Sequence, residues 1–590
     1  MTADRHQPAD GESPSVLSAR ESAADSPPST GRQAAWNYLV FGLSKSSTLI
    51  MTVVVARLLV PADFGLFALA LLVVNLFDYM KDLGVGAALV QHPGKWNRLA
   101  PTGLTLSVIF GVVFGVALAA AAPLGAELLD QPQLTPLIRV LAIGLAISAL
   151  GVIPAARLRR DLDFRKRIWP EFLGAAVKAA LTIGLATQGV GVWSLVYGQL
   201  AGTVVTTVLY WRVARTRVEF GFDRHEARGL VRFGVALTAA ALLGFAISNI
   251  DYLFIGIRLG DEQLGYYTLA YRLPELLVLN LCIVISEVLF SSLSRLQHSR
   301  QLLADQYLKV TTAAVALSAP IGVTLAAAAP AVIGTMYGDQ YADAAPVLAI
   351  LSIYTLVYSA SWHAGDVFKA MGRASLMIAT TVGHLGLMIA PIWFAAGHSI
   401  VMVALVLLAV ETVPFVANML IVRSVAGIPA ASLARAVLRP MPAAAFMAVV
   451  MLGLGRLVGG LPDPLILLLT GSAGLLAYIA ALRVTASELF AAGLAAVRSA
   501  RGRVADPSTA DEDSVEEPSP AADAGGMTFE GNGSPRSRFG ATTLAMIGVS
   551  LGVVLAYCLG RLRRTSRRGD TADDPPGIGP AELSQTPEQR

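Results

Sequence analysis

Charged side chains lie inside several long apolar segments of this 590-residue chain, where they can do chemistry that apolar side chains cannot. Two of them are cations, Lys45 near the middle of one segment and Arg272 in a later one. The guanidinium of arginine offers a planar fork of donors that matches a phosphate group, and lysine acts as a point charge. Lys45 and Arg272 are therefore candidates for binding an anionic, phosphate-bearing group.

A second group of candidates consists of carboxylates at similar depth, with one lysine among them. They are Asp78, Lys81, Asp82, Asp251, Glu275 and Glu411. Ionisable residues at bilayer depth usually face a water-filled cavity or a partner. A carboxylate in such a cavity can bind a coupling ion, either H⁺ or Na⁺, because desolvation favours its neutral form.

Each candidate also has a purely structural interpretation. Asp78, Lys81 and Asp82 are spaced i, i+3, i+4 and can pair with one another, and Asp251 can pair with Arg272. Glu411 is a lone carboxylate near the middle of its segment, where a structural hydrogen bond and proton coupling both remain open. We expect His384 to be a buried structural histidine. Cys282 and Cys558 lie in apolar segments and offer neither a disulfide framework nor a metal-ligand spacing, so we expect no metal site.

The elements that position these residues are membrane-spanning helices. The chain is 55% hydrophobic and 15% charged, against about 25% charged residues in soluble proteins. Fourteen apolar segments of about 20 residues, enough for a helix to cross a bilayer, lie between residues 33 and 482. Alternate gaps carry 22 basic residues, and the other gaps carry only Arg57, Arg258 and Arg456.

Basic loops remain on the cytoplasmic side. We therefore expect a multi-pass protein of the plasma membrane with a cytoplasmic N-terminus. The net charge of +4 is concentrated in these loops and does not indicate a nucleic-acid partner.

Two motifs recur about 200 residues apart, six segments later in each case. Arg57-Leu58 with Gly65-Leu66-Phe67 matches Arg258-Leu259 with Gly265-Tyr266-Tyr267, and 136–143 matches 346–353. Because six is even, both copies have the same orientation in the membrane. This predicts two six-helix lobes related by an axis along the membrane normal, with a central cleft between them. The predicted fold class is an all-α polytopic membrane protein, with two further helices and an uncertain fifteenth apolar segment.

The segments divide the chain into seven regions. They are a disordered cytoplasmic tail (1–32), an N-terminal six-helix lobe (33–215), a C-terminal six-helix lobe (216–425), helices thirteen and fourteen (426–485), a flexible polar linker (486–539), an extra apolar segment (540–560), and a basic then polar disordered tail (561–590). Five arginines follow the fifteenth segment, on the side that the charge rule disfavours. That segment is either an exception to the rule or does not fully cross.

Several short motifs follow one another along the chain. They are Val55-Ala56-Arg57-Leu58-Leu59, Asp63-Phe64-Gly65-Leu66, Asp82-Leu83-Gly84-Val85-Gly86, Leu134-Thr135-Pro136-Leu137-Ile138, Arg159-Arg160-Asp161-Leu162-Asp163-Phe164-Arg165-Lys166 and Met336-Tyr337-Gly338-Asp339. In this order, the set resembles the polysaccharide-transporter family, in its colanic-acid-exporter-like branch. That family is part of the multidrug/oligosaccharidyl-lipid/polysaccharide flippase superfamily. The resemblance covers about residues 33–485.

The resemblance implies a V-shaped pair of lobes and a flippase. Its expected substrate is an undecaprenyl-diphosphate-linked oligosaccharide repeat unit, moved across the plasma membrane for surface polysaccharide biosynthesis of the exopolysaccharide or lipopolysaccharide type. Lys45 and Arg272 would then bind the diphosphate, and a polysaccharide polymerase and glycosyltransferases are the implied protein partners.

The alternatives within the superfamily are a lipid II flippase and a drug/cation antiporter. A membrane glycosyltransferase or polymerase is disfavoured, because the outer gaps are too short to hold a donor and an acceptor. The sequence contains no Gly-x-x-x-x-Gly-Lys motif. We expect neither an enzyme nor a cofactor, only a coupling ion.

Overall fold

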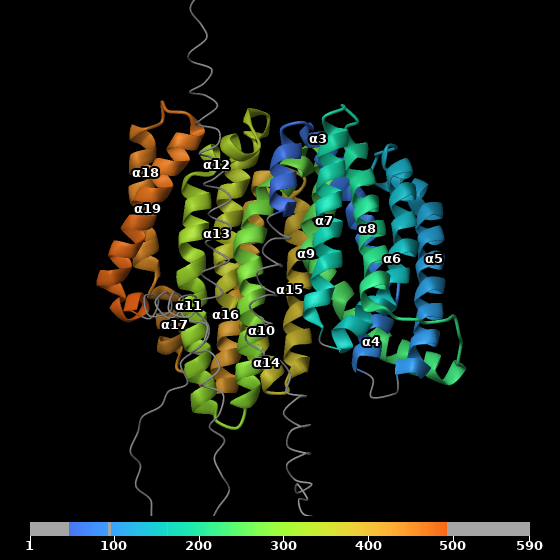
Figure 1. The fold of residues 1–590 in the computed structure, drawn as a ribbon. Helices are drawn as coiled ribbons and strands as arrows, with labels where there is room; N and C mark the ends of the chain where they lie inside the picture. The colour runs from blue at the N-terminus through green and yellow to red at the C-terminus, as the bar shows by residue number, and fades with distance from the viewer. Residues whose placement is uncertain (1–46, 92–95, 162, 492–590) are drawn as a thin grey trace, which may run out of the picture.

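The computed structural model describes residues 47–91, 96–161 and 163–491. This part of the chain is an all-α bundle without strands (Figure 1). Twelve of its helices are long and apolar enough to cross a membrane. One of the twelve, Arg224–Arg295, contains two of the predicted segments, and the shorter helix Ser47–Ala56 is the described part of the first. Thirteen of the fourteen predicted segments are therefore confirmed, the first lies largely outside the described residues, and the chain is a multi-pass membrane protein.

The first lobe follows Ser47–Ala56 with five long helices and one short one. They are α3 (Pro61–Met80), α4 (Val85–Gln91), α5 (Trp96–Leu128), α6 (Leu134–Arg160), α7 (Phe164–Ala186) and α8 (Val192–Ala214). Small residues let their backbones approach closely, as is usual for helices in membranes. A Cβ on Gly198 of α8 would lie 1.9 Å from Oγ1 of Thr182 on α7. The antiparallel pair α7 and α8 can therefore pack in this way only with a glycine at position 198.

The second lobe begins with α9, and three additional helices pack beside it on α11 and α12. Its elements are α9 (Arg224–Pro274), η1 (Glu275–Leu279), α10 (Asn280–Arg295), α11 (Arg300–Ala327), α12 (Ala329–Met336), η2 (Asp339–Tyr341), α13 (Ala344–Trp362), α14 (Ala364–Ala370), α15 (Ala374–Ala395) and α16 (Ile400–Ala426). The additional helices are α17 (Ala430–Leu438), α18 (Met441–Leu457) and α19 (Asp463–Thr485).

Several of these helices are interrupted. α9 contains two spanning helices that meet at Gly260, whose φ of 83° and ψ of −178° are not helical. The second of them continues through η1, a π-helical turn that follows Pro274. The helix made of α13 and α14 is broken at His363. Such interruptions free backbone groups in the membrane and often occur at functional sites.

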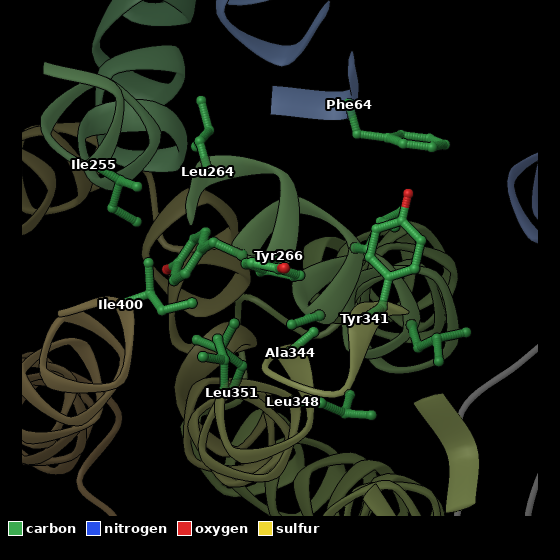
Figure 2. Close-up of a cluster of buried hydrophobic side chains, with 14 of the residues drawn as sticks. Phe64, Ile255, Leu264, Tyr266, Tyr341, Ala344, Leu348, Leu351 and Ile400 are labelled. Carbon is green, nitrogen blue, oxygen red and sulfur yellow. The ribbon is translucent and has the colours of Figure 1, made fainter. Parts of the chain in front are cut away.

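The largest hydrophobic core contains residues of both lobes. This core includes Phe64 of α3, Leu264 and Tyr266 of α9, and Tyr341 and Leu348 of the second lobe (Figure 2). At the other end, the second lobe has a core of its own, and another core joins the first lobe to Ala227 and Leu230 of α9. We call this second end the basic end, because the loops with most of the basic residues lie there. The two lobes therefore share their largest core at the end opposite the basic end, and at the basic end the first lobe packs against α9.

The joint between the lobes is made by the repeated motif itself. A Cβ on Gly65 would lie 1.7 Å from the carbonyl oxygen of Asp261, and one on Gly265 would lie 1.9 Å from that of Pro61. Arg57 also donates from Nη2 to the carbonyl oxygens of Gly334, at 3.1 Å, and Thr335. The two copies of the motif thus meet where the lobes join, and glycine is required in both.

Candidate functional site

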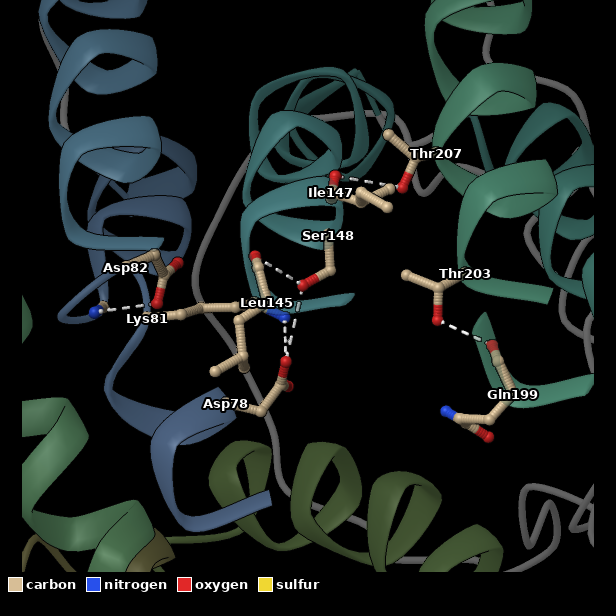
Figure 3. Close-up of polar contacts among 10 residues, drawn as sticks. Asp78, Lys81, Asp82, Leu145, Ile147, Ser148, Gln199, Thr203 and Thr207 are labelled. Carbon is tan, nitrogen blue, oxygen red and sulfur yellow. Dashed lines mark hydrogen bonds and ion pairs between the residues drawn. The ribbon is translucent and has the colours of Figure 1, made fainter. Parts of the chain in front are cut away.

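The first lobe encloses a cavity of about 870 Å³, which we call the first-lobe cavity. Residues of α3, α4, α6, α7 and α8 line it, and Leu237, Thr238 and Ala241 of α9 complete the wall. Figure 3 shows polar side chains from the first lobe that face one another around this space, among them Asp78, Ser148 and Thr203. The polar lining is unusual for the interior of a membrane bundle and indicates a solvated site.

The three charged residues at the end of α3 all line this cavity. Lys81 Nζ lies 2.6 Å from Asp78 Oδ1, the pairing that their spacing predicts. Asp82 instead accepts hydrogen bonds from the backbone N–H groups of Gly84, at 3.2 Å, and Gly86, at 3.1 Å. Asp82 therefore stabilises the turn into α4, and only Lys81 contributes a cation here.

Lys178 is a second cation of the first-lobe cavity, and it comes from the middle of α7. Its Nζ lies 2.5 Å from Oε1 of Gln199 on α8. Among the residues that the structure describes, no carboxylate lies within ion-pair distance of it. A lysine at this depth without an acidic partner is suited to an anionic ligand. Our sequence interpretation missed it, although its position within an apolar segment is the signal that singled out Lys45.

Arg272 lies near this lysine but belongs to the second lobe. Its positive charge is close enough to interact with that of Lys178. Its Nη1 lies 3.3 Å from Oε2 of Glu275, and both side chains are partly exposed. Arg272 therefore pairs with Glu275 rather than with Asp251, the partner that the sequence left open. Lys45 lies outside the described residues.

The second lobe encloses a smaller cavity of about 210 Å³, which we call the second-lobe cavity. Its lining includes two carboxylates, Asp251 and Glu275, and the aromatic residues Tyr271, Tyr354, Tyr358 and Trp362. Asp251 is buried and accepts a hydrogen bond of 2.6 Å from the hydroxyl of Tyr267. Because α9 also supplies Asp251 to this cavity, α9 forms a wall of both cavities.

Glu411 of α16 is not the lone carboxylate that the sequence indicated. Its Oε2 lies 3.3 Å from Nε2 of His384 on α15, and both side chains are largely buried. The carboxylate is also near enough to Tyr354 and Tyr358 to interact with them electrostatically. The His384–Glu411 pair thus lies beside the second-lobe cavity. Our interpretation treated His384 as structural because the two residues are far apart in the sequence.

The charged residues thus form two groups with different chemistry. The larger cavity has three cations, Lys81, Arg159 and Lys178, against the carboxylates Asp78 and Asp82, whereas the charged residues of the smaller one are the carboxylates Asp251 and Glu275. In the described ranges, no group of three or more His, Cys, Asp or Glu side chains could hold a metal ion. The arrangement can bind an anion beside the first lobe and protons in the second.

Comparison with known proteins identifies the family. Residues 54–346 match the family model described as polysaccharide biosynthesis protein. Residues 54–346 belong to that family. The chain is 26% identical over 297 residues to the teichuronic acid biosynthesis protein TuaB of Bacillus subtilis, covering 50% of this chain and 62% of TuaB. It is 25% identical over 329 residues to the succinoglycan biosynthesis transport protein ExoT of Rhizobium meliloti, covering 55% of this chain and 65% of ExoT. The matched part thus spans a little under two thirds of each relative.

The fold of this chain is also found among solved structures. The lipid II flippase MurJ in an inward closed conformation superimposes with a TM-score of 0.64 at 13% identity. The superposition covers 77% of this chain and 99% of the MurJ chain. At this identity the likeness concerns the fold alone, and it confirms the predicted arrangement of two six-helix lobes with two further helices.

Proposed function

We propose that this polysaccharide biosynthesis protein is a flippase for a lipid-linked oligosaccharide, and that Lys178 and Arg272 bind the diphosphate of the lipid carrier. The carrier we infer is undecaprenyl diphosphate, and the product would serve surface polysaccharide assembly. The observation that carries the proposal is Lys178, a cation without a carboxylate partner among the described residues, in a cavity of about 870 Å³. The fork of donors on arginine matches a phosphate, and lysine binds phosphate as a point charge.

The size of the cavity supports a bulky head group. Pockets of about 300–1,000 Å³ hold ligands of drug size, and the first-lobe cavity is near the upper limit. A diphosphate with a few sugar rings fits this range, while the apolar lipid tail remains in the bilayer beside the protein. The transport reaction makes and breaks no covalent bond, so the proposal is a transporter and not an enzyme.

A drug/cation antiporter is the second candidate, and the carboxylates of the second-lobe cavity favour it. That cavity, at about 210 Å³, is smaller than pockets that hold drug-sized ligands. At the larger cavity the cations Lys81, Arg159 and Lys178 outnumber the carboxylates Asp78 and Asp82, so its net charge would repel a cationic drug. We therefore place the flippase ahead of the antiporter.

Equilibrium binding of undecaprenyl diphosphate to the purified protein tests the proposal. This probe has the group that every substrate of the proposed class shares, whatever its sugars. A charge-assisted hydrogen bond contributes about 1.5–3 kcal/mol, and 1.4 kcal/mol is a factor of ten. We therefore expect Lys178→Ala to weaken binding about 10- to 100-fold.

The matched control is Arg456→Ala, which removes an exposed cation of α18 that lines neither cavity. It should leave the affinity unchanged. Equal affinity of the parent and Lys178→Ala would exclude this site. Binding of ethidium in place of the lipid would favour the antiporter.

We also propose that the basic end faces the cytoplasm, because basic loops are retained there. A cysteine placed at the exposed Arg217 should resist a membrane-impermeant maleimide in intact cells, and one placed at the exposed Glu262 should react. Labelling of position 217 alone would reverse the orientation.

We infer that the coupling ion is H⁺. Glu411 has a histidine beside it, whereas hard metal cations prefer several oxygen ligands. A carboxylate that is charged in one facing state and neutral in the other can supply the difference in binding energy that drives alternating access. Flipping in proteoliposomes should respond to an imposed proton gradient and lose that response in Glu411→Gln. A response to a sodium gradient alone would contradict the choice of ion.

A further inference from the structure

The break between α13 and α14 carries a buried group of ionisable side chains that the proposed mechanism does not use. α13 ends at Trp362, α14 begins at Ala364, and His363 lies between them. His363 and Asp366 are both buried, in the half of the second lobe that is nearer the basic end. Buried polar groups at a broken helix in a membrane protein often bind ions.

These side chains form one hydrogen-bonded group with Ser286 of α10. The hydroxyl of Ser286 donates to Asp366 Oδ2 at 2.6 Å and accepts from the indole Nε1 of Trp362 at 2.8 Å. Nδ1 of His363 lies 3.2 Å from the Ser286 hydroxyl and 3.5 Å from Asp366 Oδ2. The imidazole is therefore oriented by a carboxylate that could stabilise a positive charge on it.

The other ring nitrogen of the histidine lacks a partner. Nε2 of His363 is buried and makes no hydrogen bond to any residue that the structure describes. An unpaired buried polar atom costs about 1–3 kcal/mol. A site that only supported the broken helix would gain stability from an apolar residue at this position.

Lys369 completes the group on the side of the basic end. Its Nζ lies 3.3 Å from Asp366 Oδ1, and its side chain is 45% exposed, against 4% for Asp366. Lys369 can therefore move into water, and its departure would leave the carboxylate to the histidine alone. The cation of Lys369 and a protonated His363 thus compete for one buried carboxylate.

The neighbouring helices add few further charges. On α11, Tyr307 is near enough to Asp366 to interact with it electrostatically. On α15 and α16, His384 and Glu411 pair with each other. Among the described side chains, those of His363 and Lys369 are the cationic groups within ion-pair distance of Asp366. The side chain of Glu287, next to Ser286 in the sequence, is outside the described set.

We propose that His363, Asp366 and Ser286 form a proton-binding site, loaded from the basic end when Lys369 releases Asp366. The proton binds at Nε2 of His363, and the resulting imidazolium donates from Nδ1 to the Ser286 hydroxyl, with the carboxylate of Asp366 beside it as counter-charge. Its role in driving transport rests on the proposed flippase function. The site itself does not, because it can be titrated in the protein without substrate.

A row of aromatic residues connects this site with the second-lobe cavity. Trp362, whose indole donates to Ser286, lines the cavity together with Tyr358 and Tyr354. The ring centroids of Trp362 and Tyr358 are 5.3 Å apart, and those of Tyr358 and Tyr354 are 5.8 Å apart. A water occupies about 30 Å³, so about seven fit in 210 Å³. Water and tyrosine hydroxyls can thus carry a proton from the site towards Glu411.

Trp362 provides a probe of the site in the purified protein without substrate. A protonated imidazole quenches a neighbouring indole, and histidine is the side chain that ordinarily changes charge at about pH 5–8. Subtracting the emission of Trp362→Phe from that of the parent isolates the Trp362 component. We expect this component to fall as the pH is lowered through that range and to be independent of pH in His363→Gln. His398→Gln, which changes an exposed histidine, is the control and should titrate like the parent.

Two further variants give opposite shifts that a structural role would not produce. Lys369→Gln removes the competing cation from a half-exposed position, so the midpoint should move to higher pH. Asp366→Asn removes the counter-charge, so the midpoint should move to lower pH by about one unit or more. A titration that persists in His363→Gln, or a midpoint that does not rise in Lys369→Gln, would overturn the proton site.

Flipping in proteoliposomes separates this proposal from the flippase function. With a proton gradient imposed, His363→Gln should lose the gradient-driven rate and keep its affinity for undecaprenyl diphosphate. An unchanged gradient response would refute the coupling role of the site. Absence of lipid binding in the parent would instead refute the flippase, while the fluorescence titration would still test the site.

Discussion

Both lobes are built from membrane-spanning helices, yet their cavities differ in size and in the balance of their charges. The first-lobe cavity, of about 870 Å³, is lined by the cations Lys81, Arg159 and Lys178, by Asp78 and Asp82, and by hydroxyl and amide groups. The second-lobe cavity, of about 210 Å³, is lined by Asp251, Glu275 and aromatic rings. The first can hold a large anionic head group, whereas the second can hold little more than protons and water.

Helix α9 connects the two cavities, because it forms part of the wall of each. Leu237, Thr238 and Ala241 face the first-lobe cavity, and Ser248 and Asp251, further along the same helix, face the second. A change of charge in the second lobe therefore acts on a helix that also bounds the proposed substrate site. Proposed sites for substrate and protons can thus be separate and still share one helix.

Substitutions on α9 that fill one cavity at a time test whether the two cavities have separate roles. Ala241→Trp places an indole in the first-lobe cavity, and Ser248→Trp places one in the second. We expect Ala241→Trp to weaken binding of undecaprenyl diphosphate about 100-fold or more, equivalent to about 2.7 kcal/mol. Ser248→Trp should bind normally and lose gradient-driven flipping. If both variants bind equally well, the head group does not occupy the first-lobe cavity.

The guanidinium of Arg272 tests whether the second lobe contributes to the anion site. We expect Arg272→Ala to abolish flipping without lowering expression. Arg272→Lys should restore it only in part, because the fork of donors is lost while the charge remains. Full activity in Arg272→Lys would show that Arg272 acts through its charge alone. Full activity in Arg272→Ala would show that Arg272 is not part of the anion site.

The spanning helices and their division into two lobes could be predicted from the sequence. Apolar length, alternating basic loops and the repeat around Gly65 and Gly265 predicted the helices and the two lobes, because the bilayer restricts spanning elements to helices. Both glycines prove to be essential contacts between the lobes. Lys45 and residues 540–560 lie outside the described part of the chain, so our predictions for them stay predictions.

The site could be predicted only in part. Residues one helical turn apart, such as Asp78 and Lys81, were paired correctly because the helix itself brings them together. The pairs His384–Glu411 and Lys178–Gln199 come from different helices, and their contact depends on helix rotation and depth. The spacing of residues along the sequence does not determine the rotation or the depth of a helix.

Removal of the hydrogen bond between Tyr267 and Asp251 tests whether the second-lobe cavity is independent of lipid binding. Tyr267→Phe removes the donor that lies 2.6 Å from the carboxylate. Loss of a hydrogen bond to a charged group costs about 1.5–3 kcal/mol. We expect a lower thermal unfolding temperature with unchanged affinity for undecaprenyl diphosphate. An affinity change as large as that of Lys178→Ala would contradict the separation of the two cavities.

The smallest expected effect concerns the ion pair between Asp78 and Lys81. Asp78 is 44% exposed, and exposed ion pairs contribute about 0–1 kcal/mol. Asp78→Asn should therefore leave stability nearly unchanged. It should also release Lys81 to the ligand and raise affinity for undecaprenyl diphosphate by no more than about fivefold. A loss of affinity would show that Asp78 itself takes part in binding.

The most direct test of the account is the position of the diphosphate in an experimental structure. Cryo-electron microscopy of the protein with bound undecaprenyl diphosphate would locate two adjacent phosphates. We expect both phosphates in the first-lobe cavity, within about 4 Å of Lys178 Nζ and close to the guanidinium of Arg272. Density for the phosphates in the second-lobe cavity, or on the lipid-facing surface of the bundle, would contradict it.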